Sequence, residues 1–174
     1  MMRFKKFTPM QNRILGIDPG YGRLGIAILD NEKNNPKLVH SECFQTSEKL
    51  EHGDRLGLIA EKTREIIKKF KPARLAIETL IFSKNVKTAL KVAEVRGVIM
   101  AEAANAGIET LEYHPNSIKI AITGYGKSDK KQIIFMIDKI LQINKTGKKK
   151  IRYDDEYDAI AIALTATVNN YPHK

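Results

Sequence analysis

Four acidic residues are placed where folding would bring carboxylates together. Asp18 and Glu78 each follow a short apolar run, and Asp155 and Asp158 are three residues apart near the end of the sequence. On a helix, that spacing puts both side chains on one face. Carboxylate oxygens are the ligands that Mg²⁺ prefers, and four carboxylates placed together repel one another unless cations lie between them. The pattern predicts a site for hard divalent cations.

Each acid also has a purely structural interpretation. An Asp-Pro-Gly sequence such as the one at Asp18 often only starts a turn, and acids in the first turn of a helix favour its N-terminus. We assign that helix-end role to Asp154 and Glu156, and we favour the metal-binding role for Asp158, which shares a face with Asp155. No other chemistry competes. The four histidines are scattered without ligand spacing, and the sequence has no Gly-x-Ser-x-Gly motif for covalent catalysis.

The elements that must position the acids begin with a hairpin. Residues 14–17 form a short, β-branched run that predicts a buried strand, and residues 24–29 predict its antiparallel neighbour. Pro19 and Gly20 turn the chain directly after Asp18, so the carboxylate stays at the sheet edge. Residues 20–25 also match the dinucleotide pattern G-x-G-x-x-G. We reject that match because the glycines lead into a strand, whereas the dinucleotide fingerprint needs a helix.

The rest of the chain alternates strands and helices. If the strands that end in Asp18 and Glu78 are parallel neighbours, both acids project from the same edge of the sheet. Ser128 is the predicted N-cap of the fourth helix. The pattern predicts an α/β fold with a mixed five-stranded sheet, three antiparallel strands followed by parallel strands, and helices on both faces. The expected strands are residues 14–17, 24–29, 38–46, 74–78 and 108–113, and the expected helices are residues 50–70, 85–105, 115–122, 128–141 and 154–168.

Composition limits the function classes. The 174 residues predict one domain, residues 13–169, with a flexible extension over 1–12 and a tail over 170–174. Thirty Lys and Arg residues against twenty Asp and Glu residues give a net charge of +10, which favours a polyanionic partner. The single cysteine, Cys43, excludes an internal disulfide and favours a cytoplasmic protein; its position in an expected strand predicts a core residue. No apolar run approaches the roughly 18 residues that span a bilayer.

The predicted helix over residues 85–105 has apolar and small residues on more than one face. One face would pack on the sheet, and the other could pair with a second subunit. A helix buried in a larger core is the equal alternative.

The sequence resembles a known family, the RuvC-type Holliday-junction resolvases of the ribonuclease H-like fold. The resemblance runs from about residue 14 to residue 165. It is carried by the motifs Ile14-Leu15-Gly16-Ile17-Asp18-Pro19-Gly20, Ala76-Ile77-Glu78, Lys84-Asn85, Ala89-Leu90-Lys91, Ala93, Arg96-Gly97, Thr123-Gly124, Lys130 and Asp155-x-x-Asp158-Ala159-Ile160-Ala161-Ile162-Ala163.

The resemblance implies a homodimeric, Mg²⁺-dependent endonuclease that nicks two opposed strands of a four-way DNA junction. It implies two Mg²⁺ ions per site, for which Mn²⁺ substitutes, and a branch-migration motor as a partner. The family's metal-binding acids correspond to Asp18, Glu78, Asp155 and Asp158, and its basic positions at the DNA surface correspond to Lys119 and Lys130, with Lys84 as a further candidate.

The family also carries an apolar wedge after the strand-end glutamate, often a phenylalanine three residues on. This chain has Ile81 there and Phe82 next, so both are candidates to insert into the junction, unless they pack under the loop. The nearest alternative is another ribonuclease H-like enzyme that cuts RNA. Acids at all four positions argue against an inactive nucleic-acid-binding protein, and an actin-like ATPase would need two such lobes, whereas this chain has room for one.

Overall fold

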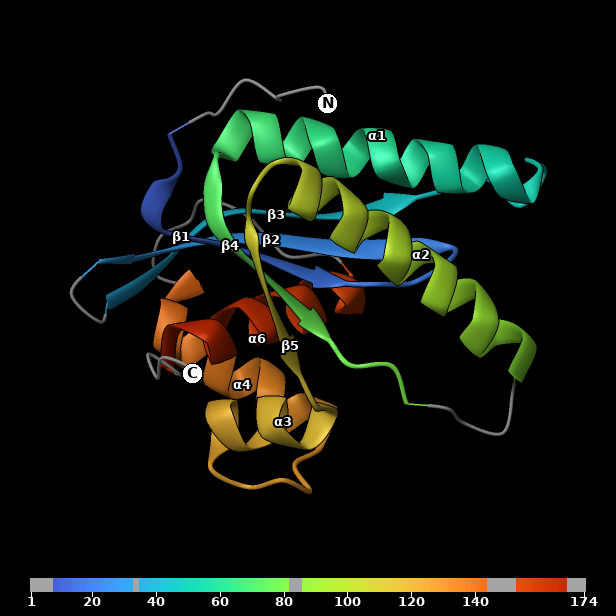
Figure 1. The fold of residues 1–174 in the computed structure, drawn as a ribbon. Coiled ribbons are helices and arrows are strands. Elements are labelled where there is room, and N and C mark those ends of the chain that lie inside the picture. Colours follow the sequence, from blue (N-terminus) through green and yellow to red (C-terminus); the bar gives the residue numbers. More distant parts are fainter. Residues whose placement is uncertain (1–7, 33–34, 82–85, 144–152, 169–174) are drawn as a thin grey trace.

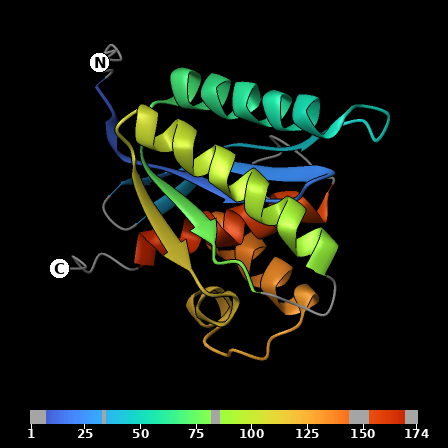
Figure 2. The ribbon, with the colours of Figure 1, turned by 45° about the vertical axis from the view of Figure 1, so that its right-hand side comes forward.

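The computed structural model describes residues 8–32, 35–81, 86–143 and 153–168. In these ranges a five-stranded sheet is covered by helices on both faces (Figures 1 and 2). The strands are β1 (Met10–Asp18), β2 (Arg23–Glu32), β3 (Asn35–Gln45), β4 (Pro72–Glu78) and β5 (Glu109–Tyr113). The helices are α1 (His52–Phe70), α2 (Val86–Asn105), α3 (Pro115–Thr123), α4 (Lys130–Leu141) and α6 (Asp154–Val168). No described helix has both the length and the apolar character needed to cross a membrane.

The strand order is β3-β2-β1-β4-β5. Strands β1, β2 and β3 pair antiparallel, whereas β4 pairs parallel with β1, and β5 pairs parallel with β4. The predicted sheet of three antiparallel strands followed by parallel strands is confirmed. The strand assigned to residues 24–29 also confirms that the glycines after Asp18 do not open a dinucleotide-binding helix.

Alternation along β1 divides the core into two halves. Leu15 and Ile17 are buried on the face that α1 and α2 cover, and Ile14 is buried on the face that α3, α4 and α6 cover. Since successive side chains of a strand point to opposite faces, Asp18 falls on the α6 side. This alternation decides which helix can meet the acid.

Helix α6 lies between the sheet and the pair α3 and α4 (Figure 1). Its residues from Ala159 to Thr167 are all buried, which explains why its sequence is apolar on every side. The close approach depends on Gly16, because a Cβ atom there would lie 2.4 Å from the Ala159 carbonyl oxygen and 2.6 Å from the Ala163 Cβ. The glycine therefore fixes how near α6 comes to β1.

The predicted N-terminal extension is too long. Strand β1 begins at Met10, whose backbone N–H donates to the Lys71 carbonyl oxygen at 2.9 Å, so residues 10–12 belong to the fold. These residues are exposed and lack apolar alternation, which is why their strand is not visible in the sequence. Residues 1–7 and the predicted tail over 170–174 lie outside the described ranges.

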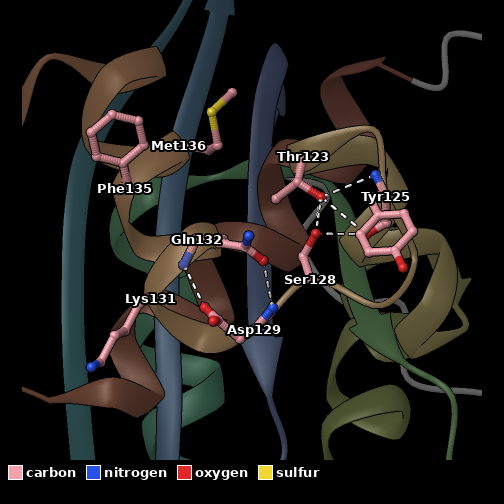
Figure 3. Close-up of a pocket in the computed structure, with 8 residues that line it drawn as sticks. All are labelled: Thr123, Tyr125, Ser128, Asp129, Lys131, Gln132, Phe135 and Met136. Atoms are coloured by element: carbon pink, nitrogen blue, oxygen red, sulfur yellow. Dashed lines mark hydrogen bonds between the residues drawn. The ribbon is translucent and has the colours of Figure 1, made fainter.

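The predicted cap of α4 is also wrong by one residue. Asp129 is the N-cap, because its carboxylate accepts from the Gln132 N–H at 2.8 Å while the Gln132 side chain accepts from the Asp129 N–H at 2.9 Å (Figure 3). Ser128 is buried instead and donates to the Tyr125 carbonyl oxygen at 2.7 Å. The reciprocal pair is a capping box, and it outcompetes a lone serine.

Candidate active site

Asp18 and Glu78 end two strands that lie side by side in parallel. Ile17 pairs with Ile77, so the two acids follow at the same edge of the sheet, as predicted. Ala76 is buried on the α6 side, and by the alternation of β4 Glu78 faces that side too. The chain after Glu78 is held by the Thr79 N–H, which donates to the Tyr113 carbonyl oxygen at 2.9 Å.

The N-terminal turn of α6 brings Asp155 and Asp158 to this edge. Asp18 pairs with Gly25 of β2. A Cβ atom on Gly25 would lie 2.0 Å from the Asp155 carbonyl oxygen and 3.2 Å from the Asp18 Cβ. The missing side chain therefore lets the backbone of Asp155 touch β2 directly beside Asp18.

The acids share one electrostatic environment. Burial raises the pKa of Asp18 to about 7, and the negative charges of Asp158, Glu78 and Asp155 add to the rise. Burial, and then the charge of Asp158, also raise the pKa of Glu78. Burial likewise raises the pKa of Asp158, although Lys130 opposes that rise. The carboxylates at this site repel one another, and a bound cation would reduce that repulsion.

Basic side chains surround the acids. The Lys130 ammonium donates to the Asp158 carboxylate at 2.9 Å, and the Arg23 guanidinium lies 3.5 Å from the Asp155 carboxylate. The positive charge of Lys119 opposes the rise in the pKa of Glu78. Two lysines predicted to contact DNA therefore act on the acidic cluster itself, and Arg23 is a basic neighbour that the sequence did not reveal.

As the side chains lie, no three carboxylate, imidazole or thiol groups among the described residues are close enough to share a metal ion. The carboxylates are instead partly occupied by Lys130 and Arg23. Binding of an ion by Asp18, Glu78 and their two partners on α6 would require these side chains to turn toward one another. The donor chemistry fits a hard cation, and the metal site stays a prediction.

Cys43 is not a core residue. It is half-buried on β3, and its thiol donates to the Asp155 carboxylate at 3.7 Å. Burial and the charge of Asp155 raise the pKa of this thiol to about 11, so it stays protonated at neutral pH. Asp18, Gly25 and Cys43 form one row across three strands.

Glu156 lies in the first turn of α6, as predicted, and it also makes a buried contact with β3. It is 3% exposed, and the Ser41 hydroxyl donates to its carboxylate at 2.7 Å. The contact joins the first turn of α6 to β3, which steadies the turn that carries Asp155.

The predicted wedge lies only partly within the described chain. Ile81 is 50% exposed, so it does not pack under its loop. Phe82 and Lys84 fall in the range 82–85, outside the described residues.

A separate hollow of about 440 Å³ lies beside α3 and α4 (Figure 3). It is lined by Thr123, Tyr125, Ser128, Asp129, Lys131, Gln132, Phe135 and Met136. None of the four predicted acids lines it, so it is separate from the predicted site at the sheet edge.

Comparison with known proteins agrees with this geometry. The sequence model of the family described as crossover junction endodeoxyribonuclease RuvC matches residues 14–166. The chain is 41% identical to the enzyme of that name from Finegoldia magna over 87% of this chain and 90% of the relative. It is 42% identical to the one from Brachyspira hyodysenteriae over 90% of this chain and 94% of the relative.

Solved structures give the same result. The chain resembles Thermus thermophilus RuvC in complex with a Holliday junction substrate, with a TM-score of 0.80 and 30% identity over 89% of this chain and 92% of that one. The fowlpox virus resolvase in complex with Holliday junction DNA shares the fold, with a TM-score of 0.57 and 19% identity over 89% of this chain and 98% of that one.

Proposed function

Because the chain belongs to the RuvC family of crossover junction endodeoxyribonucleases, we propose that it resolves four-way DNA junctions by nicking two opposed strands. The observation that carries the proposal is the meeting of Asp18, Glu78 and the first turn of α6 at one sheet edge. The net charge of +10 agrees with a DNA substrate. We assign the activity to the cytoplasm, with a branch-migration motor as the working partner.

The four acids would hold two Mg²⁺ ions, or Mn²⁺ in their place. The chemistry supplied by such ions is activation of a water molecule and neutralisation of charge on the phosphate and on the leaving 3′ oxygen. The fit rests on the donor set, which is all carboxylate, and on the repulsion and burial that raise the pKa of Asp18. Protonated Asp18 is a poor ligand, so binding of a cation would also release its proton.

In this proposal, Lys119 and Lys130 bind the phosphates that flank the scissile bond. Lys130 is the better supported, because its ammonium is both partly exposed and 2.9 Å from the Asp158 carboxylate. A DNA phosphate near that carboxylate would be within reach of the same ammonium. Lys84 has the same expected role.

The test of the site is a set of isosteric substitutions. We expect Asp18→Asn, Glu78→Gln, Asp155→Asn and Asp158→Asn each to lower Mg²⁺-dependent junction nicking by at least about 10³-fold while junction binding without metal stays within about twofold, because phosphate contacts and metal chemistry are separable. Asp154→Asn is the matched control, since this neighbouring acid is 70% exposed and its only described contact is with Lys130. Near-normal nicking by Asp18→Asn would disprove the assignment.

A ribonuclease H-like enzyme that cuts RNA is the rival. The same preparation should be given a four-way DNA junction and an RNA–DNA hybrid under identical conditions. Faster cleavage of the hybrid would favour the rival, and binding without cleavage of either would favour an inactive binding protein.

The wedge is tested at Ile81, whose exposure leaves it available to DNA. Apolar insertion costs a few kcal/mol in unstacking but stabilises a distorted junction. We expect Ile81→Ala, or Phe82→Ala if the neighbour is the wedge, to reduce the fluorescence of 2-aminopurine at the junction centre and the nicking rate together. If neither substitution changes either signal, the loop has no wedge.

A further inference from the structure

The turn directly after Asp18 is held in place by the buried side chain of Arg55. The Arg55 guanidinium lies over the Tyr21 ring at 3.8 Å from its centroid, and Arg55 Nη2 donates to the Tyr21 carbonyl oxygen at 3.2 Å. Arg55 Nε donates to Thr46 Oγ1 at 3.0 Å. One side chain of α1 therefore holds both the ring and the backbone of a residue three positions from Asp18.

Thr46 completes this grip from the end of β3. Its hydroxyl donates to the Tyr21 carbonyl oxygen at 3.1 Å, and its backbone N–H donates to the Gly22 carbonyl oxygen at 3.1 Å. A second tether reaches the ring, since Tyr21 Oη and His52 Nδ1 are 2.9 Å apart and His52 Nε2 lies 2.8 Å from the Glu94 carboxylate. The turn is thus connected to α1, α2 and β3.

Arg55 is a buried charge held by hydrogen bonds and a cation–π contact instead of an ion pair. The residue is 6% exposed, and no carboxylate lies within ion-pair distance of it in the ranges that the structure describes. A buried cation without an anionic partner is costly. A hydrophobic residue could join α1 to the sheet without that cost, but it could not donate to the Tyr21 carbonyl oxygen and to Thr46 at once.

The turn between Asp18 and Arg23 is tight, so fixing Tyr21 also restricts the backbone of Asp18. The Gly20 N–H donates to the Asp18 carbonyl oxygen at 3.1 Å, and a Cβ atom on Gly20 would lie 2.0 Å from the Arg23 carbonyl oxygen. Pro19 removes one further backbone freedom. With Tyr21 and Gly22 fixed, the backbone of Asp18 has few other positions.

We propose that Arg55 is a positioning residue for the Asp18 carboxylate, acting through the stacked Tyr21 turn. The inference deepens the proposed function, because it rests on Asp18 being a metal ligand there. Outer groups that orient metal ligands typically affect metal affinity or activity by 10- to 100-fold.

The experiment compares Arg55→Met and Arg55→Lys in the full-length protein, with Arg64→Met as the matched control. Arg64 lies on the same helix but binds the Glu102 carboxylate on the surface, with Nε 3.0 Å from Oε2. Three quantities are measured: Mn²⁺ affinity of the DNA-free protein by electron paramagnetic resonance of the free ion, the single-turnover nicking rate at saturating junction, and junction affinity in EDTA.

We expect Arg55→Met to weaken Mn²⁺ binding and to slow single-turnover nicking by about 10-fold or more, with junction affinity in EDTA within about twofold of wild type. Arg55→Lys should recover part of both losses, since an ammonium can still lie over the ring. Arg64→Met should match wild type. A folded Arg55→Met protein with unchanged Mn²⁺ affinity and nicking rate would overturn the proposal.

If Arg55→Met does not fold, Thr46→Val and Tyr21→Leu decide, because each removes one part of the grip and leaves the arginine in place. Both are expected to weaken Mn²⁺ binding, and wild-type values for both would overturn the proposal. Asp18→Asn separates a failure of the Asp18 assignment from a failure of the positioning role of Arg55. If that variant keeps Mn²⁺ binding and nicking, the assignment of Asp18 as a metal ligand fails, whereas loss in Asp18→Asn with no change in Arg55→Met refutes the positioning role alone.

Discussion

At the scale of single residues, burial of the Asp18 carboxyl lowers the stability of the metal-free protein. Its pKa is raised from an ordinary value of 3.8 to about 7, by burial and then by the other acids. A carboxyl whose pKa is raised by folding holds its proton more tightly in the folded protein than in the unfolded chain. It therefore costs almost nothing below pH 3.8, and it lowers the free energy of unfolding progressively between pH 3.8 and about pH 7, above which the loss is constant.

We therefore predict that Asp18→Asn stabilises the metal-free protein at pH 8 while it abolishes nicking. The full rise in pKa sets an upper limit of about 4 kcal/mol on the gain in free energy of unfolding, at about 1.4 kcal/mol per pH unit. Thermal melts in EDTA at pH 4 and pH 8 measure it, and the gain should nearly vanish at pH 4. Exposed Asp154→Asn is the control, and an equal gain at both pH values would contradict the prediction.

At the scale of elements, the contact between β1 and α6 holds the acids together. We predict that Gly16→Ala lowers the free energy of unfolding by roughly 1–3 kcal/mol, because its Cβ would lie 2.4 Å from a carbonyl oxygen of α6 and the helix must move. The same shift displaces the helix that carries Asp155 and Asp158, so nicking should fall more than stability alone explains. Urea unfolding and nicking rate are the two measurements.

Gly57→Ala serves as the control for that prediction. Gly57 lies on α1, and a Cβ atom there meets nothing within 4 Å, so the alanine should be neutral or stabilising by about 0.5–1 kcal/mol. Equal destabilisation by both alanines would show that the β1–α6 contact is not the cause.

The sequence predicted most elements because their apolar periods are regular. The structure confirms the hairpin after residue 14 and the helix that begins at Asp154. It also confirms the parallel pairing of the two strands that end in Asp18 and Glu78. The Asp129 cap was missed although the spacing to Gln132 is that of a capping box, which was readable.

The other misses have a different cause. Arg55 reaches the Tyr21 turn across 34 positions, and the Ser41 contact of Glu156 spans 115. Contacts of this kind depend on how elements pack, so the sequence predicted neither contact. The local sequence pattern therefore pointed to the four acids, but not to the contacts of Arg55 and Glu156 that fix the neighbouring backbone.

At the scale of the whole molecule, α2 has an apolar face that no other described element covers. Val86 and Leu90 are 58% and 54% exposed, and Gly97, Ala101 and Ala104 continue the exposed stripe. A helix simply buried in the core is thus not what the structure shows. We propose that this stripe pairs two copies of the chain about a two-fold axis, which suits a substrate with two opposed strands.

We predict that wild-type protein sediments at micromolar concentration with twice the chain mass of 19.7 kDa, and that Leu90→Asp sediments as a monomer and loses paired nicks. Burial of an unpaired charge in the pairing face is the physical reason. Phe135→Asp is the matched control, since Phe135 is 58% exposed on the opposite side of the sheet. A monomeric wild type that still makes paired nicks would refute the dimer.

The position of α6 in the chain has a consequence for the newborn protein. Asp155 and Asp158 follow every other described element in sequence, and the helix that carries them packs between the sheet and the pair α3 and α4. While a ribosome is still making residues 1–150, the emerging chain has Asp18 and Glu78 but neither of the other acids nor the helix that packs on Gly16. If the four acids form the site, as proposed, the site is complete only once α6 has docked, and translation products that stop before residue 154 lack two of its four acids.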